Sequence, residues 1–553
     1  MPRTVKVAVI GSGLAGLTAA YLLTKPTSQE GDVKIEVHLF EKAPMLGMDS
    51  SSISLPAGGR EKSWRVDVPM RSFQGGYYPQ LIALYKRLGV AFRETDFSYS
   101  FSLLSPPTQT QPRQINATTI YNGASGRGGL SMPSILDEHY YRVKDQGTLI
   151  RWVTRAWTVG LFVLMTVHIT LCYLRMLFYV LPIWRTKKLE KTTFEEWAEQ
   201  TVPTGVLARW TGMDIAWRDY THTVLLPLFS AVCTAPERDV LRHPVEEFLD
   251  YIWLTLGTHH YVVLHGVQDV VARLTATVQN IHLSSTISDI SSDPQNPRLT
   301  SLHCDTPDGS FVHTGFHHII FGTQASRAVP LLSSYRNSLH PGDPKRYAVE
   351  AQIRCMQAFE YRPTIVINHT DPTLLPDNAR DHRDLNLICF DPDATAHSLF
   401  PQEKGYRHWS ADIVPTTYTM ATHVLTPPKG YTPHLPQVYQ TTNPIIPPEE
   451  GTVLSVAKLE RAILTVKSKE ALKGLYLEER RRWWQCAGQG VSRLGKLQGA
   501  GRLKNVEGPG IWICGSFAYA GIPLLEGCVV SARNVVEQGI LKMEGLELRC
   551  SPW

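Results

Sequence analysis

The sequence has 553 residues, a formal net charge of +5, 43% hydrophobic residues and 19% charged residues. This length allows two or more domains, since a domain commonly has roughly 100–200 residues. The small net charge gives no indication of nucleic-acid binding, and the composition is that of an ordinary globular protein. The nine cysteines include no CxxC pair, which favours reduced thiols in a cytosol-facing protein over a disulfide framework.

The first predicted element is a buried parallel strand at residues 5–10, followed by a glycine-rich turn and the helix-forming segment LTAAYLL. The turn has the pattern Gly11-x-Gly13-x-x-Gly16. In such a turn the first glycine makes the tight bend, the second lets a pyrophosphate approach the backbone, and the third lets the helix pack against the strand. The helix N-terminus then offers free N–H groups to the phosphates.

A second apolar strand, residues 37–40, ends at Glu41, whose carboxylate can accept hydrogen bonds from both ribose hydroxyls. The spacing from Gly11 to Glu41 exceeds the usual value of roughly 20 residues, and the polar segment 25–32 explains the excess as a longer loop. We therefore predict a dinucleotide site rather than the glycine turn of another α/β protein. Because the first strand begins almost at Met1, no signal peptide is expected.

Three further segments extend the motif: KAPMLGM (42–48), VDVPM (66–70) and YYPQL (77–81). With the glycine turn and Glu41, they resemble the flavin-containing amine oxidase and phytoene desaturase superfamily. The VDVPM and YYPQL segments look like those of a little-characterised branch of predicted FAD-binding proteins, some of which are associated with lipid modification.

The sequence departs from the superfamily pattern at three places. Met48 replaces the second glycine of the LGG segment, Asp49 occupies a position that is often arginine, and Pro69-Met70 replaces a common Gly-Phe. The resemblance places these positions near the flavin, so the local geometry there is expected to differ.

An unusual apolar segment, residues 156–174, has 19 residues without Asp, Glu, Lys or Arg. As a helix it would be about 28 Å long, close to the thickness of a bilayer core. Basic and aromatic residues, which favour the membrane interface, flank it: Arg151, Trp152, Arg155, Trp157, Arg175, Tyr179, Trp184, Arg185, Lys187 and Lys188.

A single crossing of the bilayer would separate the two ends of the chain, which the resemblance places in one flavin domain. We therefore predict that residues 150–185 form a helix or hairpin embedded in one leaflet, held by apolar burial and attraction to acidic lipids. The alternative is a long buried helix of the substrate domain.

The rest of the central region alternates between the two predicted domains. A helix is expected at 193–199, and residues 259–274 resemble the strand, glycine and helix that return the chain to the cofactor domain. A strand at 281–290 follows, where the resemblance places the backbone of Ile287 against the adenine. The pattern also predicts a hairpin at 299–312 and a core strand at 317–323.

The last landmark is a strand ending in Gly515-Ser516, followed by a loop and by a helix that opens at Glu526-Gly527. It resembles the closing flavin motif of the superfamily, in which this helix N-terminus points at the isoalloxazine ring. Its dipole would stabilise negative charge on the reduced ring.

These observations predict an α/β fold in which a discontinuous, glutathione-reductase-like FAD-binding Rossmann-type domain carries an inserted mixed α+β substrate domain and a membrane-associated helical segment. The predicted cofactor domain comprises residues 1–90, 260–335 and 505–545. The predicted substrate domain comprises residues 91–259 and 336–504.

FAD is the expected cofactor. The residues predicted to bind it are Gly11, Ser12, Gly13, Leu14, Ala15, Gly16, Glu41, Lys42, Gly47, Met48, Ile287, Gly515, Ser516, Glu526 and Gly527. The resemblance implies that Phe517 and Tyr519 face the flavin and the substrate, with core packing and a surface loop as the respective alternatives. Covalent attachment through Cys514 or Cys528 is a further alternative to non-covalent flavin.

No metal site is expected. Neighbouring residues on a strand point to opposite faces, so the histidine pairs at 259–260 and 317–318 are poorly suited to share one ion.

The predicted function is an FAD-dependent oxidoreductase that acts on a lipid-like substrate at a cytosol-facing membrane surface, with no nucleic-acid partner. One alternative is a flavin amine oxidase for a soluble amine. Another is a non-catalytic binding protein, because Rab GDP dissociation inhibitors resemble this fold without using flavin.

Overall fold

The computed structural model describes residues 3–27, 33–56, 63–108, 111–123, 128–137, 148–391, 413–427, 435–479, 482–500, 508–550 and 553. The polar loop predicted within residues 25–32 lies mostly outside these ranges.

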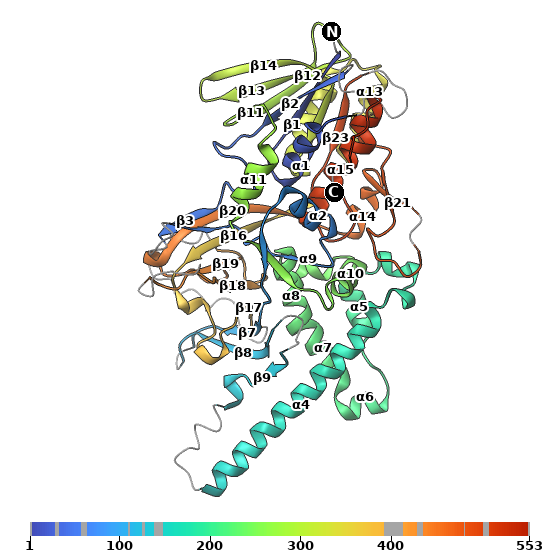
Figure 1. Ribbon diagram of the computed structural model, residues 1–553. Coiled ribbons are helices and arrows are strands. Elements are labelled where there is room, and N and C mark those ends of the chain that lie inside the picture. The colour runs from blue at the N-terminus through green and yellow to red at the C-terminus, as the bar shows by residue number, and fades with distance from the viewer. Residues whose placement is uncertain are drawn as a thin grey trace.

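A five-stranded parallel sheet forms the upper part of the molecule in Figure 1. Its strands, in spatial order, are β11 (Asn280–His282), β2 (Val33–Phe40), β1 (Arg3–Ile10), β15 (His318–Phe321) and β23 (Gly510–Ile513). The sheet joins three distant segments of the chain, because β23 pairs with β15 in register through Phe321 and Ile513. The predicted fold class, with a Rossmann-type parallel sheet and a mixed second domain, is confirmed.

Helices cover this sheet. Helix α1 (Leu14–Leu23) is buried along its whole length and packs against α15 (Leu525–Asn534) and α11 (Val267–Thr275). The N-terminal turn and the C-terminal helix are therefore neighbours in space.

The predicted strand 281–290 is two strands. The chain bends at Ser284, where φ is +49°, so that β11 stays in the parallel sheet and β12 begins a separate antiparallel sheet. That sheet comprises β12 (Thr286–Ser292), β13 (Thr300–Thr306) and β14 (Gly309–Phe316), and the hairpin predicted at 299–312 is confirmed.

An eight-stranded sheet forms the second domain. Its order is β20 (Val453–Ile463), β16 (Glu360–His369), β19 (Tyr439–Thr442), β18 (Met420–Val424), β17 (Leu385–Phe390), β7 (Tyr99–Ser105), β8 (Gln114–Tyr121) and β9 (Leu130–Ser131). All neighbours are antiparallel except β17 and β7.

Smaller sheets connect the two domains. They are β5 (Phe73–Gln74), β10 (His260–Val263) and β6 (Phe92–Glu94); β3 (Ile53–Pro56) and β4 (Ser63–Val66); and β21 (Tyr476–Glu479) and β22 (Val491–Leu494).

A layer of helices lies beside the eight-stranded sheet, to its right in Figure 1. These are α5 (Phe194–Gln200), α6 (Val206–Thr211), α7 (Met213–Tyr220), α8 (Leu226–Cys233), α9 (Glu237–Leu241) and α10 (Val245–Thr255). The remaining helices are α2 (Pro79–Leu88), α12 (Ala325–Ser338), α13 (Pro344–Met356) and α14 (Val466–Leu472).

Helix α4 (Thr148–Val180) projects from this layer (Figure 1). Its 33 residues make it about 50 Å long. Among the described residues it is the one helix long and apolar enough to cross a membrane, and only 11% of its most apolar window is buried. Near its C-terminal end, Cys172, Met176 and Val180 form the buried stripe that attaches it to the helical layer.

The structure corrects three expectations about this segment. Residues 148–180 form one continuous helix, so the hairpin alternative is wrong. Two of the flanking basic residues bind protein groups rather than facing outward: Arg175 donates to the Thr201 carbonyl at 2.7 Å, and Arg185 pairs with Asp250. The buried-helix alternative is also wrong for most of the length, because Trp152, Trp157 and many aliphatic side chains are exposed.

Candidate functional site

The glycine turn has the close contacts that its motif predicts. Gly11 has φ +96°, and a Cβ on Gly16 would lie 1.9 Å from the Gly11 carbonyl oxygen, so neither position accepts a side chain. A Cβ on Gly13 would meet only the Gly322 carbonyl oxygen, at 3.9 Å. The backbone is thus open at Gly13, where the motif would place a pyrophosphate.

Glu41 lies beside this turn at the end of β2. Its Oε2 accepts hydrogen bonds from Ser12 N at 2.9 Å and Ser12 Oγ at 2.6 Å, while Oε1 accepts from Ala43 N at 3.0 Å. A carboxylate has about four lone-pair sites, so capacity remains for a ribose hydroxyl. The Ser285 N–H donates to the Glu41 carbonyl, which brings the β11–β12 turn, and Ile287 beyond it, to the same side.

The segment after Glu41 folds back onto the turn. Gly47 N donates to Ser12 Oγ at 2.6 Å, and a Cβ on Gly47 would lie 2.6 Å from the Ser12 carbonyl oxygen. Met48, which replaces a glycine of the superfamily pattern, has φ +59°. It keeps the left-handed backbone of a glycine, which is strained for methionine. Asp49 pairs with Arg65 at 2.6 Å.

The C-terminal motif completes the site. Gly515 N donates to Ser531 Oγ at 2.9 Å, and a Cβ on Gly527 would lie 2.5 Å from the Ser516 carbonyl oxygen. These contacts hold the Gly515-Ser516 loop against the first turn of α15. Ser516, Leu525 and Cys528 face a large cavity.

This cavity has a volume of about 470 Å³ and extends from the cofactor turn to helix α4. At one end its wall contains Gly13, Leu14 and Met48; at the other it contains Tyr173 and Met176 of α4. Aromatic and aliphatic side chains line the space between, among them Tyr99, Phe101, Tyr121, Leu225, Leu228 and Ile252. An apolar chamber of this kind suits a hydrophobic ligand.

Phe517 and Tyr519 do not line this cavity. Phe517 is 3% exposed and packs against Phe359 in the core, and Tyr519 donates its hydroxyl to the Gly488 carbonyl at 3.0 Å. Neither residue is therefore retained as a substrate-facing group. For Phe517 the core-packing alternative holds.

The Glu526 side chain also points away from the large cavity. Its carboxylate accepts from Gln80 N and Leu81 N, both at 2.9 Å, at the start of α2. Burial raises the pKa of Glu526 to about 7. This carboxylate therefore joins α15 to α2 and contributes to the cofactor site through its backbone only.

Two arginines that the sequence analysis missed line the cavity, Arg71 and Arg461. Burial and the neighbouring positive charge of Arg71 together lower the pKa of Arg461 to about 10, so Arg461 remains charged at neutral pH. An arginine such as Arg71 likewise keeps its charge in proteins. Arg71 donates to the Met48 carbonyl at 3.3 Å. An arginine directly after the VDVPM segment, and another in an apolar strand, were the available signals.

Three histidines of the wall are neutral at physiological pH. Burial lowers the pKa of His243 to about 3 and those of His260 and His423 to about 4. Cys528 also faces the cavity whereas Cys514 is fully buried outside it, so Cys528 is the better placed of the two for covalent attachment. Burial raises the Cys528 pKa to about 11, which keeps it a thiol.

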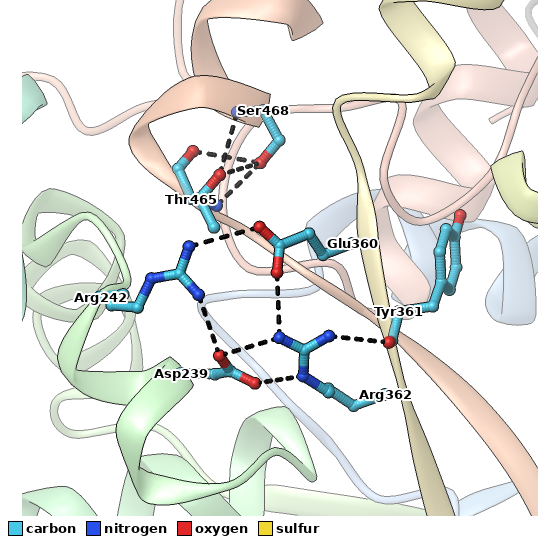
Figure 2. Close-up of polar contacts among 7 residues, drawn as sticks. All are labelled: Asp239, Arg242, Glu360, Tyr361, Arg362, Thr465 and Ser468. Carbon is cyan, nitrogen blue, oxygen red and sulfur yellow. Dashed lines mark hydrogen bonds and ion pairs between the residues drawn. The ribbon is translucent and has the colours of Figure 1, made fainter.

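An ion-pair network joins the helical layer to β16 (Figure 2). Arg362 Nε donates to Asp239 Oδ2 at 2.6 Å, and its Nη2 donates to Glu360 at 3.0 Å. Arg242 bridges the same two carboxylates, each at 3.3 Å. Asp239, which faces the cavity and is 1% exposed, is thereby neutralised.

Comparison with protein families agrees with the geometry of the turn. Residues 9–88 match the family model described as an NAD(P)-binding Rossmann-like domain. The Rossmann-like domain identified in this way contains the glycine turn, Glu41 and α2.

Solved structures with similarity over almost the whole chain are distant. An oxidoreductase from Methanosarcina mazei has 11% identity and a TM-score of 0.47, covering 96% of this chain and 99% of that one. A double mutant of putrescine oxidase has 12% identity and a TM-score of 0.46, and wild-type putrescine oxidase bound to putrescine has 13% and 0.41; each covers 96% of this chain and 98% of its own. The sequence matches no curated protein.

Proposed function

We propose that this protein is an FAD-dependent oxidoreductase that acts on a hydrophobic, lipid-like substrate taken from a membrane surface. The single observation that carries this proposal is the continuity of the cavity. One chamber has the glycine turn in its wall at one end and two residues of the exposed helix α4 at the other.

The residues present fit FAD. The open backbone at Gly13 and the α1 N-terminus would bind the pyrophosphate, the remaining lone pairs of Glu41 would bind the ribose, and the first turn of α15 would face the ring. When bound, FAD would supply the redox chemistry by accepting or donating hydride. The chain contributes binding, orientation and an apolar chamber that excludes water.

The surface around α4 supports membrane association. Exposed apolar side chains continue from α4 onto α6, where Val206, Leu207 and Trp210 are 87%, 73% and 83% exposed. His168 of α4 lies 3.0 Å from the Thr211 carbonyl at the end of α6, so the two helices form one apolar surface. Helices with such a surface bind at the bilayer interface.

The charge of the cavity argues against a soluble amine. Its wall contains two charged arginines, and the one carboxylate among the described wall residues, Asp239, is already paired with Arg362 and Arg242. A cationic amine would have no free counter-ion there. The alternative of a non-catalytic binding protein predicts purified protein without flavin.

Two measurements on the purified protein test the proposal. We expect a flavin absorption spectrum, and its absence would contradict the cofactor assignment. For membrane binding, we expect the double variant Trp157→Glu/Val163→Glu, at two exposed positions of α4, to reduce flotation with acidic vesicles at least about tenfold.

The matched control for the flotation assay is Trp483→Glu. This tryptophan is 71% exposed, close to the 69% of Trp157, but lies in the β21–β22 region. Equal flotation of the double variant and the control variant would reject α4 as the membrane-binding element.

A further inference from the structure

The cavity contains two guanidinium groups that the proposed function does not use. Arg71 and Arg461 face the cavity, and the Nε atom of each is inaccessible and has no hydrogen-bond partner among the described residues. In the same ranges, the one side-chain hydrogen bond of either group is the 3.3 Å bond from Arg71 to the Met48 carbonyl.

None of the carboxylates that the structure describes pairs with these arginines. Asp67 and Asp49 contribute favourable charge to Arg71, but Asp67 accepts from Val267 N at 3.0 Å and Asp49 pairs with Arg65. The other groups that face the pair are Tyr78, Tyr85 and Cys528, which are neutral at physiological pH because burial raises their pKa values. Asp67 and Asp49 therefore compensate the charge of Arg71 in part, whereas Arg461 is left with the repulsion of Arg71.

An uncompensated buried charge is unfavourable, and a guanidinium that keeps its charge inside a protein normally has an anionic partner. Two guanidiniums that line one cavity present several N–H donors, which suit the two oxygens of a carboxylate. The missing partner is therefore expected to be an anion that enters the cavity from outside.

We propose that Arg71 and Arg461 bind the carboxylate of a long-chain acid, whose hydrocarbon chain lies along the apolar wall towards α4. This inference rests on the proposed function and names its substrate class. The aromatic wall formed by Tyr99, Phe101 and Tyr121 leads to Tyr173 and Met176 on α4, so the acid would enter with its charged end first.

The position of Arg71 and Arg461 also indicates which carbon atoms of the substrate would lie beside the flavin. Cys528, in the first turn of α15, is close enough to both arginines to affect their pKa values, and Met48 contacts Arg71. These residues belong to the proposed flavin side of the cavity. The carbon atoms near the carboxylate, rather than the far end of the chain, would therefore lie beside the ring.

The test compares decanoate with 1-decanol, two ligands of equal chain length that differ in charge, by calorimetric titration of the holoprotein. Decanoate is expected to bind roughly 10- to 100-fold more tightly, the effect of hydrogen bonds to a charged group. Arg461→Met, which keeps an unbranched side chain but removes the charge, should abolish this preference, and Arg461→Lys should retain part of it. Equal binding of both ligands to the wild type would overturn the inference.

Controls separate this inference from other roles of the pair. Arg242→Gln changes an arginine that is half exposed and already paired, and should leave decanoate binding unchanged. If Arg461→Met shifts the flavin midpoint potential but binds decanoate as the wild type does, the pair serves the cofactor and the inference is wrong. Tighter binding of decyl phosphate than of decanoate would overturn the choice of carboxylate.

The outcomes also distinguish this inference from the proposed function. A protein that binds 1-decanol but shows no preference for decanoate keeps the proposed function and loses the inference. A protein without flavin loses the proposed function, and the decanoate titration still decides whether the arginine pair binds an acid.

Discussion

Two groups of arginines, one with a member on β16 and the other with a member on β20, differ in their partners. Arg362 on β16 has Asp239 and Glu360 within hydrogen-bond distance (Figure 2). Arg461, its register partner on β20, has no carboxylate partner among the described residues and lines the cavity together with Arg71. The first group joins two layers of the protein, whereas the second is suited to a ligand.

The difference shows how a structural charge and a binding charge can be distinguished without a bound ligand. Breaking a paired buried charge leaves its partner uncompensated and destabilises the fold, whereas removing an unpaired buried charge relieves a desolvation penalty. Substitutions at these positions should therefore change stability in opposite directions.

Among these substitutions, Arg362→Leu is expected to lower the free energy of unfolding the most. The substitution leaves Asp239, which is 1% exposed, with only the longer bond from Arg242. The free energy of unfolding should fall by about 3 kcal/mol, at the lower end of the range for a broken buried ion pair. It would be measured as a fall in the urea midpoint. Arg242→Gln is the control, expected to cost about 1 kcal/mol or less because Arg242 is 52% exposed.

A smaller change in stability is expected from Glu526, whose buried carboxyl has no cationic partner among the described residues. The pKa of Glu526 is raised from 4.5 to about 7, so between these values the folded state holds a proton that the unfolded state has released. This contribution to stability is complete below pH 4.5 and is lost as the pH rises through 7.

The variant Glu526→Gln keeps the neutral form at every pH. Relative to it, the wild type should lose about 2 kcal/mol in the free energy of unfolding between pH 5 and pH 8. Parallel urea midpoints of the two proteins over this range would show that the carboxyl titrates normally.

The smallest change in the free energy of unfolding is expected for Arg461→Met in the absence of ligand. Removing the unpaired charge should raise the free energy of unfolding by about 1 kcal/mol. A loss of stability comparable to that of Arg362→Leu would show that Arg461 has a structural role, and the contrast between the two groups would fail.

The cofactor half of the fold could be predicted because its signals are local. Gly11, Gly13 and Gly16 have defined tasks within one turn, and Glu41 closes the next strand. The fold class therefore followed from short segments of sequence.

The arginine pair could not be predicted, because Arg71 and Arg461 meet only when the two domains assemble. The direction of the loop after Ser516 could not be predicted from the sequence either. It is set by the contacts of Phe517 with Phe359 and of Tyr519 with Tyr476, which no local pattern indicates. The hairpin alternative for α4 failed for a related reason, since Arg175 binds the Thr201 carbonyl and lets the helix continue.

Met48 combines a rigid backbone with an adaptable side chain. Its left-handed backbone lies between Gly47, which is bonded to Ser12, and a carbonyl bonded to Arg71, while its thioether reaches the cavity. An unbranched thioether can change rotamer with little loss of packing. The boundary between the nucleotide turn and the chamber can therefore adjust its shape to ligands of different width while the turn itself stays fixed.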